Sequence, residues 1–141
     1  MATHRTPIIP RFGELDPYNH VNHAVYVAYF EAARCVALED IGMSLSDLAD
    51  RGIQIVVTTV EVRFREPATG RDRLTVETEV AEIRRASSRW RQRIVRDEDG
   101  KVLVEALVTA GVCDDRGKPT RPPAELMDAL ATLEPSAPSA G

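Results

Sequence analysis

The segment from Ala24 to Ile41 limits the folds open to this chain more than any other, because its pattern predicts a helix that is apolar nearly all the way round. Asn22 is a suitable N-cap in front of it, and Gly42 is a suitable C-terminal stop. Large apolar side chains fall on every face: Val25, Tyr26, Val27, Tyr29, Phe30, Val36, Leu38 and Ile41. A helix without a polar face has to be surrounded by other elements. We therefore expect this helix, which at ~1.5 Å per residue would be about 27 Å long, to lie against a concave sheet.

Downstream of the helix, the chain changes from a helical period to a strand period. Segments 59–66, 74–83 and 88–95 alternate between apolar and polar residues, and 101–113 is almost continuously apolar. Turns are predicted at 67–72, 84–87 and 97–100, so we expect these four strands to form an antiparallel meander. The remaining elements are a first strand over 6–15, helical turns over 44–52, a short helix over 124–133 and a disordered tail over 134–141.

The order of these elements predicts an α+β fold. A strand, a buried helix and then long antiparallel strands resemble the plan of the hotdog fold, in which a long antiparallel sheet wraps around one central helix. The chain length of 141 residues fits one domain, which we place at 1–133. Such a sheet covers the helix on one side only and leaves an edge open. We therefore expect a homodimer with the two sheets joined edge to edge, and a homotetramer as the further assembly.

Composition and charge exclude several classes of protein. A hydrophobic content of 43% and a charged content of 28% are typical of a globular protein, and the net charge of −4 disfavours nucleic acid or an anionic membrane as a partner. No apolar run approaches the ~20 residues that cross a bilayer, and the first residues lack the pattern of a signal peptide. Cys35 and Cys113 stand far apart in apolar segments, which favours buried thiols over a disulfide. We expect a cytoplasmic protein.

The stretch "ELDPYNHVNHAVYVAYFEAAR" (residues 14–34) concentrates reactive side chains directly before the apolar helix. It resembles the signature of the 4-hydroxybenzoyl-CoA thioesterase branch of the hotdog superfamily: an aspartate, then a His-Val-Asn segment, then Tyr and a Tyr/Phe-Glu pair. The resemblance implies hydrolysis of a thioester and a family likeness over residues 6–113. The elements that carry it are Asp16, His20, Asn22, His23, Tyr26, Tyr29, Phe30 and Glu31.

The residue types in this stretch suit the same chemistry. Asp16 can activate a water molecule or attack the carbonyl itself, and a helix N-terminus offers unpaired N–H groups to a developing oxyanion. The N–H of His23 or Ala24 is the candidate donor, and the resemblance implies His23. His20 either orients the loop by hydrogen bonds or takes part directly, and Asn22 is more readily explained as a cap. Turn and cap formation alone would also explain an aspartate and asparagines at this place.

Two further roles are open for residues of this stretch. Asp16, His20 and His23 are side-chain types that bind metals, but the chain has no other histidine except His4 and no cysteine near the loop, so we expect no metal. Glu31 is the alternative nucleophile, since some hotdog thioesterases use a carboxylate on this helix. With Arg34 three residues on, Glu31 can instead form an ion pair.

Residues 84–96 contain six arginines and no acidic residue: Arg84, Arg85, Arg89, Arg91, Arg93 and Arg96. Alternate arginines on a strand are typical of a solvated outer face, whereas guanidinium groups also suit the phosphates of coenzyme A. The sequence "RRASSR" resembles the family's Arg-Ser-Ser turn near the CoA chain, which makes Arg84, Arg85, Ser87 and Ser88 substrate-binding candidates. A role in nucleic-acid binding lacks any recognised motif.

These observations predict an acyl-CoA thioesterase that releases a free acid and CoA without a cofactor, coenzyme A being part of the substrate. The acyl group would lie in a tunnel at the dimer interface, against Tyr26, Tyr29 or Phe30. Three alternatives stay open: a hotdog enoyl-CoA hydratase or dehydratase, a thioesterase whose substrate is an acyl carrier protein, and a non-catalytic acyl-CoA-binding module.

Overall fold

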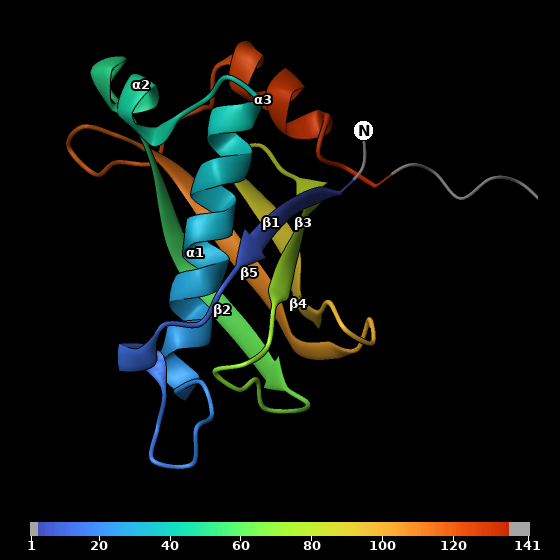
Figure 1. The fold of residues 1–141 in the computed structure, drawn as a ribbon. Helices are drawn as coiled ribbons and strands as arrows, with labels where there is room; N and C mark the ends of the chain where they lie inside the picture. Colours follow the sequence, from blue (N-terminus) through green and yellow to red (C-terminus); the bar gives the residue numbers. More distant parts are fainter. Residues whose placement is uncertain (1–2, 136–141) are drawn as a thin grey trace, which may run out of the picture.

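The computed structural model describes residues 3–135, which form one antiparallel sheet and three α-helices (Figure 1). The strands are β1 (His4–Ile8), β2 (Ile53–Phe64), β3 (Leu74–Ile83), β4 (Ser87–Arg96) and β5 (Val102–Asp114). The α-helices are α1 (His23–Asp40), α2 (Leu45–Asp50) and α3 (Ala124–Ala131), and Phe12–Glu14 forms a 3-10 turn, η1. Most of the predicted tail, from residue 136 on, lies outside the described residues.

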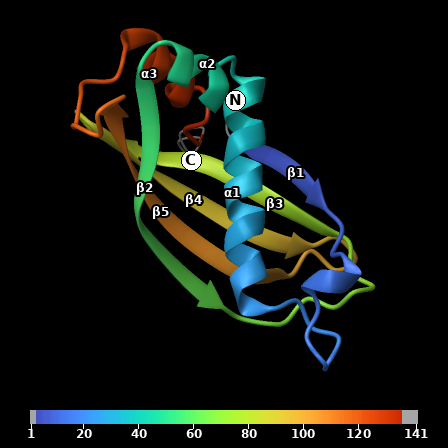
Figure 2. The same cartoon turned by 90° about the vertical axis from the view of Figure 1, so that its left-hand side faces the viewer.

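The sheet has the strand order β1-β3-β4-β5-β2 and every neighbouring pair is antiparallel. The predicted four-strand meander is therefore wrong: only β3, β4 and β5 follow one another as hairpins. β2 pairs with β5 at one edge and β1 with β3 at the other (Figure 2). The connection 65–73 can cross the end of the sheet because its backbone finds partners elsewhere, for example in the bond from Val21 N–H to the carbonyl of Ala68 at 2.9 Å.

The expected central helix is confirmed, with its start at His23 rather than Ala24 and with Asn22 as the N-cap. α1 lies across the concave face of the sheet, as Figure 2 shows. One side of the helix is buried against the sheet through Tyr26, Tyr29, Phe30, Ala33, Ala37 and Leu38. Its other side is not wrapped within this chain, since Val27 and Val36 remain 37% and 36% exposed.

A fully buried amide fixes the helix on the sheet. Gln92 of β4 donates through Nε2 to the carbonyl of Phe30 at 2.9 Å and to Oγ1 of Thr78 at 3.1 Å. Its Oε1 accepts a bond of 2.8 Å from Nη1 of Arg34. The polar atoms of the amide are thereby all paired, so this contact specifies how α1 sits over the strands without leaving a buried polar atom unsatisfied.

Several predicted boundaries differ from the observed ones. The first strand ends at Ile8 rather than at residue 15, because Pro10 has no N–H for the ladder and the chain turns into η1. β2 begins at Ile53, six residues before the predicted start at residue 59, and carries a bulge between Val57 and Thr59. α3 ends at Ala131, whereas 133 was expected.

The two cysteines are free thiols, as expected, although both are half-buried rather than buried. Cys35 lies on α1, and Cys113 lies near the end of β5. Among the residues that the structure describes, no helix is long and apolar enough to span a membrane.

Candidate functional site

The loop between Leu15 and Val21 is closed by a β-bridge between these two residues. Within it, Oδ1 of Asp16 accepts two backbone hydrogen bonds, from Tyr18 N–H at 2.8 Å and from His20 N–H at 3.0 Å. Asn19 has a φ of 62°, the left-handed conformation that asparagine tolerates better than most residues. The aspartate therefore shapes the loop with one carboxylate oxygen, and no hydrogen bond of Oδ2 occurs among the described residues.

The start of α1 adjoins this loop. Oδ1 of Asn22 accepts from Ala24 N–H at 3.1 Å, and the N–H of Val25 bonds to the carbonyl of Asn22 at 2.9 Å. Within the described part of the chain, the N–H of His23 has no acceptor, so it is the donor left open at the helix end. The N-terminal end of an 18-residue helix also carries a partial positive charge, which favours an anion at this place.

Four of the predicted site residues line one open pocket of about 330 Å³, which we call the loop pocket. Asp16 and His20 come from the loop, and His23 and Tyr26 come from the start of α1. The sequence analysis did not single out the other lining residues as site residues: Val21, Phe64, Arg65, Glu66 and Pro67. The structure thus brings the carboxylate, the histidines and the helix N-terminus together.

The connection between β2 and β3 holds the loop from the other side. Thr69 forms a β-bridge with His20, and the hydroxyl of Tyr26 accepts a 2.9 Å bond from the buried N–H of Ala68. Burial is the main cause that raises the pKa of Tyr26, so this hydroxyl stays protonated at neutral pH. The sequence signal for this support was present only as a turn prediction at 67–72, which does not say what the turn contacts.

Replacing Tyr26 by phenylalanine is expected to lower the free energy of unfolding by about 1–3 kcal/mol, because the buried N–H of Ala68 loses its acceptor. Denaturant unfolding measures this change, and Tyr18→Phe, which alters an 80% exposed tyrosine of the adjoining loop, is the control with no expected loss. Equal stability of the two variants would contradict a supporting role for the Tyr26 hydroxyl.

The other two predicted tunnel residues face the sheet rather than the loop pocket. Phe30 is fully buried in the core, and Tyr29 is 6% exposed. The hydroxyl of Tyr29 donates to Oε1 of Glu14 at 2.7 Å, and burial together with this carboxylate raises the pKa of Tyr29 far above its usual value. Tyr29 therefore ties α1 to η1.

Glu31 lies away from the loop pocket. It follows His23 by eight residues, about 12 Å along the helix, and lines a second pocket between α1 and β2. The alternative role of Glu31, an ion pair with Arg34, is absent from the described residues, where Arg34 donates to Gln92. Burial is the main cause that lowers the pKa of Arg34, with the nearby Glu31 charge acting against it.

The start of the arginine-rich segment, from Arg84 to Ser88, lies at the opposite end of the sheet from the loop pocket, whereas Arg96 at its other end pairs with Leu74. Ile83 pairs with Ser88 at the far end, whereas Leu74 pairs with Ile8 near the loop, and β3 spans about 30 Å between them. Ser88 is buried and accepts a 2.9 Å bond from Nε1 of Trp90, and Ser87 is half-buried. Arg84 is exposed and paired with Glu82 at 2.9 Å, and Arg85 is exposed.

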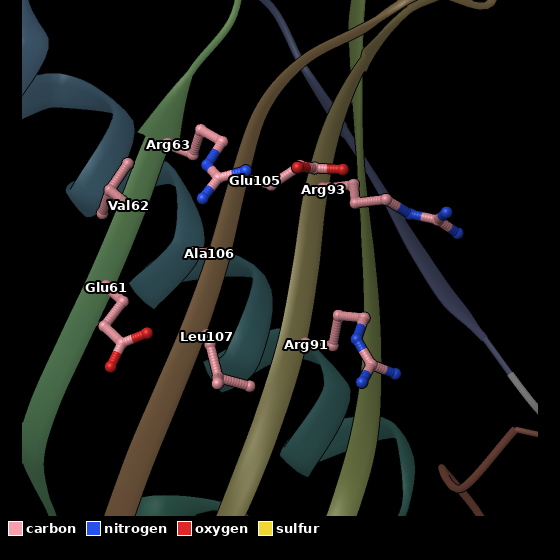
Figure 3. A pocket seen from close by; sticks show the side chains of 8 residues that line it. All are labelled: Glu61, Val62, Arg63, Arg91, Arg93, Glu105, Ala106 and Leu107. Carbon is pink, nitrogen blue, oxygen red and sulfur yellow. The ribbon is translucent and has the colours of Figure 1, made fainter.

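The alternate arginines of β4 point to the outer face of the sheet, as the pattern predicted. Arg91 pairs with Glu79 at 3.3 Å and Arg93 with Glu77 at 3.1 Å. A shallow pocket of about 360 Å³ lies on this face. Figure 3 shows its lining side chains in front of the sheet, with a helix behind the strands. Arginine and glutamate side chains surround it, including Arg63 and Glu105, and neither a histidine nor a helix N-terminus reaches it. It is a charged, solvated surface rather than a catalytic pocket.

The family model described as the thioesterase-like superfamily matches residues 10–130. The chain belongs to this superfamily. Membership confirms the expected thioester hydrolase class, and the match includes the loop, α1 and the whole strand region from β2 to β5.

Individual relatives agree with the superfamily assignment. The long-chain acyl-CoA thioesterase FadM of Escherichia coli K12 is 33% identical over 111 residues, which cover 79% of this chain and 83% of FadM. The acyl-CoA thioester hydrolase YbgC of E. coli O157:H7 is 34% identical over 111 residues, covering 79% of this chain and 81% of YbgC. The crystal structure of a DHNA-CoA thioesterase from Staphylococcus aureus superposes with a TM-score of 0.86 at 23% identity, over 94% of this chain and 91% of that one. This structural similarity confirms that the chain has the hotdog fold.

Proposed function

We propose that the protein is an acyl-CoA thioesterase, which hydrolyses R–CO–S–CoA to a free acid and CoA without a cofactor or metal. The observation that carries the proposal is the loop pocket, where the Asp16 carboxylate and the open N-terminus of α1 face the same space. The names of FadM and YbgC, both acyl-CoA thioesterases, support CoA as the thiol part of the substrate.

Asp16 supplies the base or the nucleophile in this proposal. Its Oδ1 is held by two backbone N–H groups, which leaves Oδ2 to remove a proton from water as the water oxygen attacks the carbonyl carbon. The C–S bond then breaks, and the departing thiolate takes up the proton. In the covalent variant, Oδ2 itself attacks the carbonyl carbon, the C–S bond breaks to release the CoA thiolate, and water then hydrolyses the resulting anhydride, which gives the free acid, regenerates Asp16 and supplies the proton that the thiolate takes up.

The negative charge that develops on the carbonyl oxygen needs a donor. The N–H of His23 fits this role better than that of Ala24, because Oδ1 of Asn22 already accepts the bond from Ala24. One oxyanion donor contributes about 3–4 kcal/mol to transition-state stabilisation in enzymes where it has been removed. His20, which lines the same pocket, orients the loop through its backbone bond to Asp16.

A homodimer would complete this site. β2 is an edge strand and exposes apolar side chains, among them Val56 and Val57 at 42% and 40%. β2 runs toward the loop end of the sheet, so antiparallel pairing with a second β2 across a two-fold axis would bring the partner's opposite end to the loop pocket. Arg84, Arg85, Ser87 and Ser88 could then reach the CoA portion from the partner, although they lie at the far end of their own sheet. We expect two such dimers to form a homotetramer. We expect the protein to act in the cytoplasm.

The test of this proposal is release of free CoA thiol from a panel of aliphatic and aromatic acyl-CoAs. Turnover well above the uncatalysed rate is expected, with the matched free acid as the second product. Enoyl-CoA hydration without thiol release would identify a hydratase instead. Cleavage restricted to acyl carrier protein thioesters would replace CoA as the thiol, and tight acyl-CoA binding without turnover would indicate a binding module.

A further inference from the structure

The connection between β2 and β3 contains a turn at residues 67–72, which we call the support turn, and Asp72 closes it. Oδ2 of Asp72 accepts a 2.8 Å bond from the N–H of Thr69, and the N–H of Asp72 donates to the carbonyl of Thr69 at 3.2 Å. The hydroxyl oxygen of Thr69 also accepts from the N–H of Arg71 at 3.3 Å. Asp72 therefore holds Thr69 by both polar groups of its backbone.

Thr69 in turn meets the loop that carries Asp16. It forms the β-bridge with His20, whose N–H is one of the two donors to Oδ1 of Asp16, at 3.0 Å. The N–H of Asp16 returns a 2.7 Å bond to the carbonyl of His20. Asp72 is thus connected to the Asp16 carboxylate through only two residues, Thr69 and His20.

Gly70 brings the support turn into close contact with the same loop. A Cβ atom at this position would lie 2.7 Å from Cδ1 of Leu15 and 2.9 Å from Oδ1 of Asn19, a closer approach than Cβ atoms make. Leu15 and Asn19 lie on the two sides of Asp16 along the chain. Because the turn and the loop touch without a gap, a shift of the support turn would move the loop.

Asp72 itself stays outside the loop pocket. It lines a separate shallow pocket together with four charged residues: Arg71, Arg73, Asp97 and Glu98. The two aspartates are nevertheless close to one tyrosine. Burial is the main cause that raises the pKa of Tyr26, and the charges of Asp16 and Asp72 also raise it. Asp72 therefore lies near the site without lining the space in which a substrate would react.

We propose that Asp72 is a positioning residue for thioester hydrolysis, which acts through Thr69 and His20 to hold the Asp16 carboxylate where Oδ2 reacts. A displacement of about 1 Å at a reacting group can lower a rate by about 10²-fold, even when its cause lies outside the site. This inference rests on the proposed function for the role of Asp16. It goes beyond that function in assigning a role to a residue of another connection.

Two substitutions at Asp72 test the hydrogen bond to Thr69. Alanine removes the acceptor, whereas the amide oxygen of asparagine can accept the same bond. Asp72→Ala should lower kcat for acyl-CoA hydrolysis by about 10–100-fold and change KM by less than about threefold, and Asp72→Asn should keep kcat within about threefold. Wild-type kcat in Asp72→Ala, or an equal loss in both variants, would overturn the proposal.

Asp114 is the matched control, because it closes a turn in the same way at the far end of the sheet. Its Oδ1 accepts from the N–H groups of Arg116 and Lys118, both at 2.9 Å. Asp114→Ala should lower the midpoint of urea unfolding about as much as Asp72→Ala does, and leave kcat within about twofold. A kcat loss as large as that of Asp72→Ala would attribute both effects to reduced stability and refute a positioning role.

A double variant distinguishes positioning of Asp16 from an effect elsewhere. If Asp72 acts through Asp16, adding Asp72→Ala to Asp16→Asn should change the residual kcat by less than about twofold, because the group to be positioned is already gone. A further loss of about 10–100-fold in the Asp16→Asn background would show that Asp72 acts on another group, which contradicts the proposal.

Amide hydrogen exchange gives a readout that needs no substrate. The N–H groups of Tyr18 and His20, which bond to Oδ1 of Asp16, should exchange about tenfold faster or more in Asp72→Ala. Faster exchange in a protein that hydrolyses no acyl-CoA would support the connection from Asp72 to Asp16 and refute the thioesterase. Hydrolysis by wild type, with unchanged exchange and unchanged kcat in Asp72→Ala, would support the thioesterase and refute this inference.

Discussion

Replacing Asp16 by asparagine is expected to reduce kcat for acyl-CoA hydrolysis by about 10²-fold or more, because the amide can neither accept the proton of water nor attack the carbonyl at a useful rate. The assay is release of free CoA thiol under saturating substrate. KM should change much less than kcat, since the acyl and CoA portions keep their contacts.

The geometry of the loop makes this substitution informative. An asparagine carbonyl oxygen can accept the same bonds from Tyr18 N–H and His20 N–H that Oδ1 of Asp16 accepts, so the turn keeps its shape. Circular dichroism and denaturant unfolding of the variant should match wild type, which would separate lost chemistry from lost structure. Asp47→Asn, at the first turn of α2, is the matched control with unchanged kcat.

A fully active Asp16→Asn variant would show that the aspartate acts only as a turn former. The chemistry would then have to come from His20, which shares the loop pocket, or from Glu31, which lines the second pocket between α1 and β2. Alanine at His20 and glutamine at Glu31 would distinguish these two. A folded but inactive Asp16→Asn protein, with both of those variants retaining substantial activity, would assign the base or nucleophile to Asp16.

Local patterns in the sequence predicted the elements well where one face is buried and the other solvated. The alternation in β4 placed Trp90 and Gln92 inside and Arg91 outside, and β3 was predicted with its observed bounds, Leu74–Ile83. The start of α1 was recognisable from the cap at Asn22. Each of these signals depends only on residues close together in the chain.

The strand order could not be obtained in the same way. The turn at 67–72 indicated that β2 and β3 are neighbours, whereas β2 pairs with β5 and the turn binds the 15–21 loop. Nothing local distinguishes a hairpin turn from a connection whose partners lie elsewhere in the fold. The same limit applies to Tyr29 and Phe30, since only the packed structure shows which side of an all-round apolar helix faces the sheet.

The division of the candidate residues between two ends of the sheet is also a consequence of topology. The loop residues and the Arg84–Ser88 segment both belong to the resemblance, but β3 separates them by its full length. The proposed edge-to-edge dimer would reconcile the two sets, because antiparallel pairing of two β2 strands would bring the opposite ends of the two sheets together. The sequence pointed to both groups of residues. The position of β2 at an open edge of the sheet indicates how the loop of one subunit and the Arg84–Ser88 segment of another would come together.

Gln92→Leu is expected to lower the free energy of unfolding by about 3 kcal/mol, although leucine has a similar size and is more hydrophobic. The substitution removes the acceptor of Arg34 and the donor to Phe30 and Thr78 at a fully buried position. Leaving a buried hydrogen-bonding group without its partner costs about 1–3 kcal/mol and more where the group is charged, as the half-buried Arg34 is.

Urea unfolding of wild type, Gln92→Leu, Arg34→Leu and the double variant measures this contact directly. The sum of the losses in unfolding free energy of the two single variants should exceed the loss of the double variant by about 1–2 kcal/mol. The reason is that removing both partners leaves no unpaired charge. Gln54→Leu is the matched control, since Gln54 is exposed on β2 and should change stability by less than about 0.5 kcal/mol. Strictly additive losses would show that Arg34 and Gln92 stabilise the fold independently, and that the position of α1 over the sheet is set by apolar packing alone.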